Sequence, residues 1–470
     1  MSHLLQSLRH LRHPHPAAAL RTAKSLQLVR GLAQLAHCKR SLLPSCVPAT
    51  GGATMHHMAS QPVTDTANWV DREERLEDYG PRGYHPVSVG DVLGSRYRVQ
   101  RKLGWGVYST VWLVRNERYV SSSEAAVFLF DCSAASWFFG SAGPSDPSFR
   151  TALATGAPEL HELEYLLRIH NEPTQHPGRV HVIDLLDHFY IEGPNGKHLC
   201  LVTELLSENV YSFSTNWKDE RMPIPLVKRI TRQVILGIDY LHNACELIHT
   251  DIKPANILIA LPRGGFKPSS AGVEVYVQEG PGDRSISRFR SNPLLFPIPS
   301  DLNSESAWSA FEVKLSDVGV ACWADKTDEH FTPLIQSPSL RAPEVYVGAG
   351  WGKPADIWSL GCTVYEMIMG KSMIRAGTQQ ESIPFLHMVL FGDYPRNIVE
   401  RGKYSHFFFN ADGTSKFDIP RRLPLAMQIQ GRGPPQDADM FVDFLNLMFK
   451  LDPAERASCE ELLDHPWLAQ

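Results

Sequence analysis

The chain has 470 residues, of which 43% are hydrophobic and 21% are charged, and its formal net charge is −5. These are ordinary values for a soluble globular protein, and the lack of a strong positive charge argues against nonspecific binding to nucleic acid. The eight cysteines have no metal-ligand spacing and no apolar run is long enough to cross a membrane, so we predict neither a disulfide scaffold, a structural metal nor a membrane span.

The first 64 residues contain arginine and lysine but no acidic residue, and leucines recur among them at near-helical spacing. An acid-free amphipathic N-terminus of this kind is typical of mitochondrial targeting. The alternatives are a disordered basic tail, or extra residues upstream of a later start at Met55 or Met58. We expect residues 1–83 to be a basic, disordered segment that carries no chemistry.

The next part of the chain predicts a small lobe built from strands. From about Tyr84, apolar and polar residues alternate on both sides of a glycine-rich turn, which is the pattern of two strands. The stretch "HELEYLLRI" has helical spacing, and "VHVIDLLDHFYIEGPNGKHLCLVTEL" predicts two further strands joined by a turn. We therefore expect the small lobe to span residues 84–206.

The rest of the chain, residues 207–470, contains long amphipathic stretches that predict a larger helical lobe. Strands followed by helices favour an α+β fold, and a ligand site is expected in a cleft between the two lobes. Residues 262–309 interrupt the larger lobe. Because they are rich in Gly, Pro and Ser, they predict an inserted, mobile loop.

One short polar stretch, "HTDIKPANI", combines residues that suit phosphoryl transfer. Asp251 could accept a proton from a substrate hydroxyl, Lys253 could neutralise a transferred phosphoryl group, and Asn256 could ligate Mg²⁺. The spacing is that of the catalytic loop of protein kinases, H-x-D-x-K-x-x-N. A polar loop held by Asx turns is the alternative, and it is disfavoured because further motifs follow in the kinase order.

Those further motifs are D-V-G, which begins at Asp317, and A-P-E, which ends at Glu344. In kinases the aspartate of the D-F-G motif binds the Mg²⁺ that bridges the phosphates. Two later stretches, "PADIWSLGCTVYEM" with Asp356 and "RAS" with Arg456, also match kinase motifs. In the kinase fold these residues and Glu344 are structural. Glu344 should pair with Arg456, and Asp356 should hold the backbone of the catalytic loop.

The glycine-rich turn, "LGWGVYST", lies between the first two strands of the small lobe. Glycines let backbone N–H groups approach phosphate oxygens, although G-x-G alone is a weak signal. We expect Val111 to cover an adenine ring. Thr203 would be the gatekeeper, and the backbones of Glu204 and Leu206 would meet the adenine edge.

These residues resemble those of eukaryotic protein kinases, and more narrowly those of the SR-protein kinases, which phosphorylate serine/arginine-rich splicing factors. The narrow resemblance extends from Tyr84 to Leu468, apart from residues 121–158 and the insert at 262–309, which lies where that family places a spacer. It is carried by the stretches "GYHPVSVGDVLGSRYRVQRKLGWGVYSTVWL", "IEGPNGKHLCLV", "LIHTDIKPANIL", "DVGVACW" and "GWGKPADIWSLGC".

The resemblance implies a bilobal kinase fold, ATP and Mg²⁺ as cofactors, and phosphorylation of serine in arginine/serine-rich proteins of mRNA splicing. It implies a monomer in the cytoplasm and nucleus that contacts neither nucleic acid nor a membrane directly, with the mitochondrion as the alternative from the N-terminus. The implied catalytic residues are Asp251 and Lys253, and the implied metal ligands are Asn256 and Asp317. The implied ATP-binding residues are Leu103, Gly104, Trp105, Gly106, Val111, Glu204, Leu206 and Glu162.

Thr250 stands where most kinases have an arginine in the catalytic loop. That arginine is a buried charge that needs a phosphorylated activation loop as its partner, whereas a threonine needs none. We therefore predict that any activity is independent of phosphorylation of the activation loop.

The pattern fails at one catalytic position. Glu162 corresponds to the glutamate that pairs with a lysine on the third strand of the small lobe. Ser121–Glu124 stand where that lysine is expected, and no lysine occurs from Val120 through Glu162. We expect the small lobe to be poorly formed between Ser121 and Pro158.

Three explanations are open for the missing lysine. The segment could be replaced through a splicing or gene-model difference, or the protein could be a pseudokinase that keeps the fold as a binding module. Alternatively, another cation could substitute, with Lys102 or Arg115 as candidates, although Lys102 is expected to face solvent. The leading function is a serine/threonine protein kinase, and the alternative is a catalytically impaired, kinase-like binding protein.

Overall fold

The computed structural model describes residues between 69 and 469 of the chain. The chain divides into two units, Met1–Thr64 and Asp65–Gln470, and all described residues belong to the second unit. The basic N-terminus and its predicted targeting function therefore lie outside the described residues. Among the described residues, no helix is both long and apolar enough to cross a bilayer. The described ranges are 69–81, 83–106, 109–118, 124–131, 161–262, 273–280, 284–302, 305–326, 334–375, 382–419, 422–430 and 437–469.

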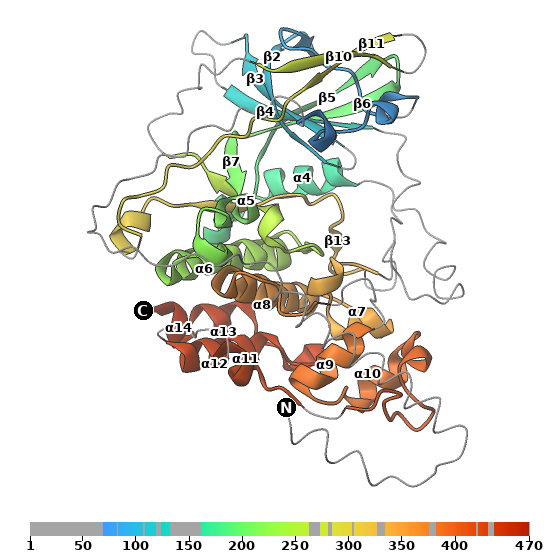
Figure 1. Cartoon of the computed structure of the whole chain (residues 1–470), viewed down its shortest axis with the longest axis vertical. Coiled ribbons are helices and arrows are strands. Elements are labelled where there is room, and N and C mark those ends of the chain that lie inside the picture. The colour runs from blue at the N-terminus through green and yellow to red at the C-terminus, as the bar shows by residue number, and fades with distance from the viewer. Residues whose placement is uncertain are drawn as a thin grey trace, which may run out of the picture. The chain divides into compact units, whose positions relative to one another are not determined.

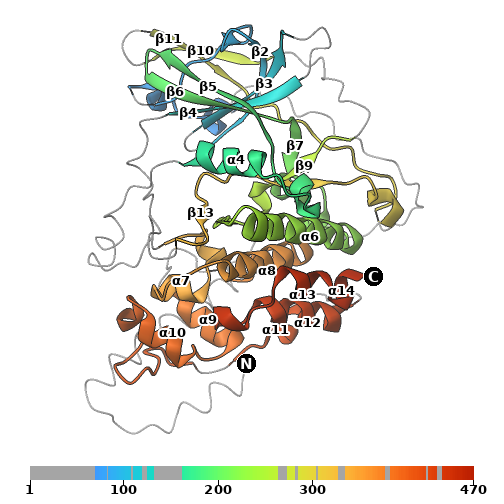
Figure 2. The same ribbon diagram turned by 180° about the vertical axis from the view of Figure 1, so that it is seen from behind.

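The small lobe is built on an antiparallel six-stranded sheet with the order β1-β2-β3-β4-β6-β5 (Figure 1). One face of the sheet carries an apolar core that includes Trp112, Val127 and Val202. Helix α4 (Glu162–Asn171) lies between the sheet and the larger lobe in both views (Figure 2). The strands are β1 (Val92–Leu93), β2 (Tyr97–Trp105), β3 (Ser109–Asn116), β4 (Glu124–Asp131), β5 (Leu185–Gly193) and β6 (Gly196–Thr203).

Strand β4 lies inside the sheet, which corrects the prediction that residues 121–158 are poorly formed. It pairs with β3 from Glu124 to Phe130 and with β6 from Ala126 to Asp131. The run of alanine, valine, phenylalanine and leucine suits a strand that is covered on both faces, and Val127 and Leu129 are buried. The prediction was wrong for this strand, and residues 132–158 lie outside the described residues.

The chain is ordered earlier than predicted. Residues 1–83 were expected to be disordered, but two short 3-10 helices, η2 (Val70–Arg72) and η3 (Leu76–Tyr79), precede the sheet. Glu73, Glu74 and Tyr79 are buried. Buried carboxylates need partners, and theirs come from β2 and from the insert.

The insert at residues 262–309 is also ordered where it is described, which corrects the prediction of a mobile loop. Strands β10 (Val275–Gly280) and β11 (Arg284–Phe289) form an antiparallel hairpin. The Phe289 ring meets the Trp112 ring edge to face, with centroids 5.6 Å apart. The hairpin therefore adds its apolar residues to the core of the small lobe.

After the hairpin the insert continues along the connection between the lobes and into the larger lobe. The Leu294 carbonyl accepts hydrogen bonds from the Ser207 hydroxyl at 2.7 Å and from the Glu208 amide at 2.8 Å. Phe296 then packs against Phe213 and Phe311. The insert is thus tied to both lobes.

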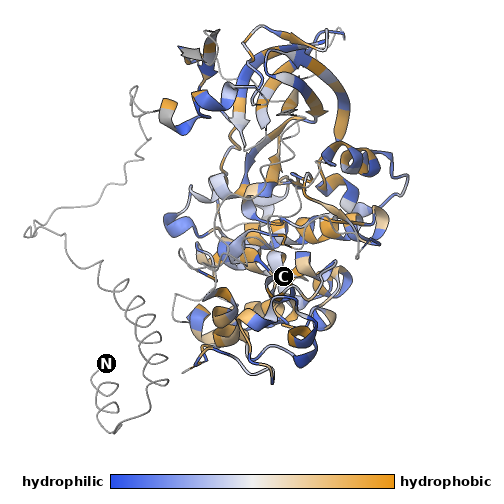
Figure 3. Ribbon diagram, turned by 90° about the vertical axis from the view of Figure 1, so that its right-hand side faces the viewer, coloured by the Kyte–Doolittle hydropathy of each residue, from blue (hydrophilic) through white to orange (hydrophobic). Residues whose placement is uncertain are grey.

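The larger lobe is mainly helical, and its two longest helices, α6 and α8, lie at its centre with most of their residues buried. Hydrophobic and hydrophilic residues are interspersed in the strands and helices of both lobes (Figure 3). The helices are α5 (Val210–Ser214), α6 (Ile224–Asp239), α7 (Pro343–Val347), α8 (Pro354–Met369), α9 (Ile383–Phe391), α10 (Arg396–Arg401), α11 (Leu425–Gln430), α12 (Ala438–Met448), α13 (Cys459–Leu463) and α14 (Pro466–Ala469). Its strands are β7 (Leu206–Asn209), β8 (Leu247–Ile248), β9 (Ile257–Ala260), β12 (Val313–Leu315) and β13 (Cys322–Trp323), paired in the orders β12-β9-β7 and β13-β8.

Contacts between the lobes fix the elements that carry the predicted site. The Ile183 amide donates to the Leu315 carbonyl at 2.9 Å, and the Tyr165 ring of α4 lies 5.6 Å from the Trp323 ring. Arg168 of α4 donates to the backbone of the π-helical turn η6 (Tyr240–Ala244) that follows α6. The predicted α+β fold with a strand-rich and a helical lobe is confirmed.

Candidate functional site

The backbone of the catalytic loop is held by one buried carboxylate. Asp356 of α8 accepts hydrogen bonds from the amides of His249 and Thr250, each at 2.8 Å. Burial acts to raise the pKa of Asp356, but hydrogen bonds and charge from His242, together with His249, hold this pKa below its usual value. An ionised Asp356 therefore fixes the loop, as the sequence predicted.

Thr250 takes a conformation that is rare for its residue type. Its φ is 69°, in the left-handed region that a β-branched residue seldom occupies. Its backbone amide donates a hydrogen bond to Asp356, and its Oγ1 donates a second one to the Val320 carbonyl at 2.6 Å. The buried threonine thus ties the catalytic loop to the segment that follows D-V-G, without introducing a charge.

The polar residues of the catalytic loop converge on Asp251. Lys253 Nζ lies 2.5 Å from Asp251 Oδ2, and Asn256 Nδ2 donates to the same oxygen at 3.1 Å. Ser337, which sequence reasoning missed, donates from Oγ to Asp251 Oδ1 at 3.2 Å. The carboxylate is therefore held on both oxygens, which suits a group that orients a hydroxyl and accepts its proton.

Asp317 follows β12 and has a positive φ of 61°. Partial removal from water, and then the negative charge of Asp251, raise the pKa of its carboxyl. Its side chain remains accessible to solvent. A bound cation would relieve this repulsion, and the oxygens of Asp317 and Asn256 are donors that suit Mg²⁺, which takes one or two protein ligands and completes its shell with phosphates and water.

Glu162 begins α4 and faces the D-V-G segment. A Cβ built on Gly319 would stand 3.0 Å from Glu162 Oε2, so the carboxyl rests against the glycine. Removal from water, and then the charge of Asp317, raise the pKa of Glu162 to about 8. In the described part of the chain no cation pairs with this carboxyl.

The absence of a basic residue on the central strand is visible in the register of the sheet. Phe128 lies between Val111 of β3 and Leu201 of β6, and it packs with the residues on the side of α4. Ala126, two residues earlier on the same side, lies opposite Thr203 at the end of β6. The α4 side of β4 thus presents an alanine and a phenylalanine.

Neither candidate for a substitute cation forms an ion pair with Glu162. Lys102 was expected to face solvent, but it is buried on the opposite side of the sheet, where its ammonium bonds to Glu73 at 2.8 Å and also to Glu74. Arg115 is exposed on β3. The contacts therefore give no support to the explanation by compensation, since Lys102 already has two carboxylate partners.

The glycine-rich turn has the openness that a ligand would require. Gly104 pairs with Val111 across β2 and β3, and a Cβ on Gly104 would meet nothing within 4 Å. At the turn, the Gly106 amide donates to the Ser109 carbonyl at 2.8 Å. Leu103, which precedes the two glycines, is partly buried, and Trp105, which lies between them, is exposed.

The predicted adenine-binding residues lie in the connection from β6 to β7. Thr203 Oγ1 donates to the Glu204 carbonyl at 3.1 Å. The Glu204 side chain bonds to Lys314 of β12 at 2.8 Å, which links the connection to the larger lobe. Leu206 begins β7 and is buried.

Comparison with models of protein families gives a match over more than half of the chain. The protein kinase domain matches residues 160–278 and 302–468. These ranges contain Glu162, the catalytic loop and the D-V-G segment. They begin after β4, so they do not include the glycine-rich turn.

Curated proteins give matches that extend over most of the chain. The serine/threonine-protein kinase SRPK of Physarum polycephalum is 31% identical over 427 residues, which cover 86% of this chain and 93% of that protein. Protein kinase dsk1 of Schizosaccharomyces pombe is 28% identical, with 85% of each chain covered. SRSF protein kinase 3 of Mus musculus is 27% identical, with 90% of this chain and 96% of that protein covered.

Among solved structures, a crystal structure of a kinase domain matches with a TM-score of 0.57 at 21% sequence identity. The match covers 82% of this chain and 98% of that chain. At this identity the likeness concerns the fold alone, and it confirms the bilobal kinase fold expected from the sequence.

Proposed function

Because this chain belongs to the protein kinase family, and within it to the serine/threonine kinases of SRPK type, we propose that it phosphorylates serine in arginine/serine-rich proteins. The phosphoryl donor is ATP with Mg²⁺. The observation that carries this proposal is the grouping of Lys253, Asn256 and Ser337 around the two oxygens of Asp251.

Each residue of this group has a role in the proposed reaction. Asp251 orients the substrate hydroxyl and accepts its proton, and Lys253 offsets the negative charge of the transferred group. Asn256 and Asp317 would hold Mg²⁺, which neutralises charge on the phosphates when it is bound. Gly104 and Gly106 leave room for phosphates beneath the turn, and the backbones of Glu204 and Leu206 meet the adenine edge.

We also propose that Phe128 stands where protein kinases carry the lysine of the third strand. Residues 125–128 read A-A-V-F, which has the spacing of V-A-I-K. Phe128 also lies on the side of the sheet that faces α4, the helix of Glu162. A phenyl ring there cannot hold the α- and β-phosphates, so the chain binds ATP with one charge-assisted contact fewer.

A second function is favoured by this same position. A chain with Phe128 here, and with no cation paired to Glu162 among its described residues, could serve as a kinase-like binding protein with negligible turnover. Loss of one electrostatic group that acts mainly on the transition state typically costs about 10²–10³ in rate. A rate of phosphoryl transfer that is low but measurable would therefore indicate a weak enzyme, and no measurable transfer would indicate the binding module.

The experiment that tests the function is transfer of radiolabelled phosphate from ATP to a peptide of alternating arginine and serine. Asp251→Ala serves as the blank, and a lysine/serine peptide tests the requirement for arginine. We expect incorporation above the blank with the arginine peptide. Incorporation equal to the blank, together with a nucleotide-dependent rise in melting temperature, would favour the binding module instead.

We further propose that the protein acts as a monomer in the cytoplasm and nucleus, without direct contact with nucleic acid or a membrane. The acid-free N-terminus favours the mitochondrion as the alternative. A fluorescent fusion of the full chain, compared with one lacking residues 1–64, tests this. Mitochondrial fluorescence that depends on those residues would overturn the proposed location.

A further inference from the structure

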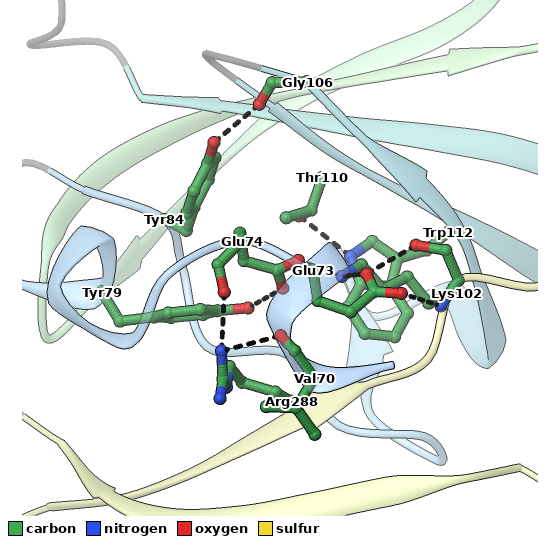
Figure 4. A network of polar contacts seen from close by, with 11 residues as sticks. Val70, Glu73, Glu74, Tyr79, Tyr84, Lys102, Gly106, Thr110, Trp112 and Arg288 are labelled. Carbon is green, nitrogen blue, oxygen red and sulfur yellow. Dashed lines mark hydrogen bonds and ion pairs between the residues drawn. The ribbon is translucent and has the colours of Figure 1, made fainter. Parts of the chain in front are cut away.

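The glycine-rich turn is held by a tyrosine that does not belong to the catalytic motifs. Tyr84 Oη donates a hydrogen bond to the backbone oxygen of Gly106 at 2.6 Å (Figure 4). Gly106 is the second glycine of the turn. In a planar trans peptide the carbonyl and the next N–H point in opposite directions, so a carbonyl held in place also directs the donor that follows it.

Tyr84 is itself fixed at a second point. Its backbone oxygen accepts a hydrogen bond from Asn195 Nδ2 at 2.6 Å, and the same amide donates to the Tyr79 carbonyl at 2.7 Å. The Tyr84 and Tyr79 rings lie 5.7 Å apart, in a small core that also contains Ile286 of β11. Because its backbone and ring are both held, the hydroxyl is presented to the turn from a rigid support.

The strand that enters the turn is anchored by a buried cluster of charges (Figure 4). Lys102 of β2 bonds to Glu73 and Glu74, which precede Tyr84 in the chain. The insert completes the cluster. Ser291 donates to Glu73 from its amide and its hydroxyl, each at 2.7 Å, and Arg288 donates to the Glu74 carbonyl at 2.9 Å.

This cluster favours one arrangement of the three segments. Buried charges are costly unless each is paired, so shifting β2, residues 69–84 or the hairpin would leave a charge unpaired. The side chains of Lys102 and Glu74 are fully inaccessible to solvent. The base from which Tyr84 reaches the turn is therefore fixed relative to β2.

From these contacts we propose that Tyr84 is a positioning residue for the phosphates of a bound nucleoside triphosphate. Its hydroxyl fixes the orientation of the Gly106 carbonyl, and Gly106 lies in the turn that is proposed to cover the phosphates. This inference rests on the proposed binding of ATP beneath the turn. Since Tyr84 acts at the phosphate end, it contributes to recognition of triphosphates and not of nucleosides.

The first test compares the affinities of MgATP and adenosine by titration calorimetry. Tyr84→Phe removes only the hydroxyl, and we expect it to weaken MgATP binding about fivefold, the size of one hydrogen bond, with adenosine binding unchanged. Tyr79→Phe is the matched control, because its hydroxyl bonds to Glu74 in the same core. It should lower the melting temperature and leave the ratio of the two affinities unchanged. An unchanged ratio in Tyr84→Phe would overturn the proposal.

The second test needs no nucleotide. Hydrogen exchange of the nucleotide-free protein should become faster at Gly106 and Ser109 in Tyr84→Phe, because the Gly106 carbonyl then keeps only the Ser109 amide, at 3.4 Å, as its donor. Amides of β5 and β6 should keep their rates. Equal exchange at the turn in the wild type and Tyr84→Phe would overturn the positioning role. Wild-type protein that binds neither MgATP nor adenosine would instead contradict the proposed function, and exchange at the turn would still decide the role of Tyr84.

Discussion

Glu162 of α4 lies against Gly319, with its Oε2 3.0 Å from the position that a Cβ on that glycine would take. Its carboxyl therefore faces the D-V-G segment. In kinases the corresponding glutamate pairs with a lysine, whereas here the charge of Asp317 helps to raise the pKa of Glu162. The carboxyl groups of Glu162 and Asp317 thus lie in the region where other kinases place a lysine between the phosphates and the helix of Glu162.

The first prediction is that Phe128→Lys restores the missing clamp. Under the proposed assignment, a lysine at this position would have Glu162 as its partner, and it would add a cation for the phosphates. We expect tighter binding of MgATP and a rise of about 10²–10³ in the rate of phosphoryl transfer. Radiolabel transfer and calorimetric titration with MgATP measure both effects.

The control for this prediction is Phe128→Leu, which keeps an apolar side chain at the same site and should leave both quantities near their wild-type values. Phe128→Lys combined with Glu162→Ala should lose part of the gain, because the lysine then has no partner. A folded Phe128→Lys protein whose affinity and rate equal those of the wild type would contradict the assignment of this position.

The second prediction concerns the pH dependence of stability. The raised pKa of Glu162, about 8 in the folded protein, means that the folded state keeps a proton that the unfolded chain loses near its ordinary value of 4.5. Stability from this group therefore falls as the pH rises between these values. Glu162→Gln removes the dependence, so its advantage over the wild type should be absent at pH 4 and greatest above pH 8.

The measurement is thermal or denaturant unfolding of the wild type and Glu162→Gln at several pH values. Taking the difference cancels groups that titrate equally in both proteins. We expect a gain for the variant on the order of 1–2 kcal/mol at pH 8, less than the full shift implies, because the side chain keeps some contact with solvent. A difference that stays constant from pH 4 to pH 8 would show that Glu162 titrates normally.

The sequence predicted the parts of the molecule whose signals are local. The α+β arrangement follows from runs of strands and then helices, and the order of polar residues in the catalytic loop follows from a short motif. Asp356 was identified in advance as the residue that holds the loop, because it lies in a motif whose aspartate has this role in the kinase fold. These features depend on residues close together in the chain, or on motifs whose spacing is itself the signal.

Other features were missed because their partners are distant in the sequence. In the sequence Glu73 and Glu74 resemble part of a polar tail. In the structure both pair with the ammonium group of Lys102. The composition of the insert, rich in Gly, Pro and Ser, predicted a loop, but its Phe289 packs against Trp112 in the core of the small lobe. Composition reports the average of a segment, whereas burial depends on the few apolar residues that meet a surface.

Strand β4 shows a third kind of failure. Its sequence differs from the pattern of the resembling family, and the difference suggested a damaged lobe. A strand needs apolar residues of suitable shape on both faces, and Ala126, Val127 and Phe128 supply them. The sheet therefore forms although this strand carries no lysine, because folding and catalysis make separate demands on the same strand.

The third prediction is that removal of phosphate from the protein leaves its activity unchanged. Thr250 is neutral, and its hydroxyl already donates to the Val320 carbonyl. Arg341, at the end of the activation segment, donates to the carbonyls of Ile335 and Gln336. Both side chains have partners within the protein, so a phosphate group is not needed to satisfy them.

Treatment with a phosphatase, followed by the peptide assay, measures this, and the Phe128→Lys variant supplies a faster reaction if the wild type is slow. Thr250→Arg provides the contrast. It places a cation in a buried position without a partner, and we expect it to lower both stability and activity. Loss of activity after phosphatase treatment of the wild type would refute the prediction.

The fourth prediction is that two similar ion pairs differ greatly in their contributions to stability. Glu344 and Arg456 are joined by two hydrogen bonds of 2.7 and 2.6 Å, and both side chains are fully buried. Glu344→Ala leaves the Arg456 guanidinium buried without its carboxylate, which should cost about 3–5 kcal/mol in the free energy of unfolding. Denaturant unfolding measures this cost.

The matched control is Glu400→Ala, which breaks an exposed pair with Arg396 on α10 that has the same 2.6 Å distance. Exposed pairs within a helix gain little, because water screens the charges and two flexible side chains must be ordered. We expect no resolvable change for this variant. Equal losses in the two variants would mean that separation, and not burial, sets the contribution of such pairs in this protein.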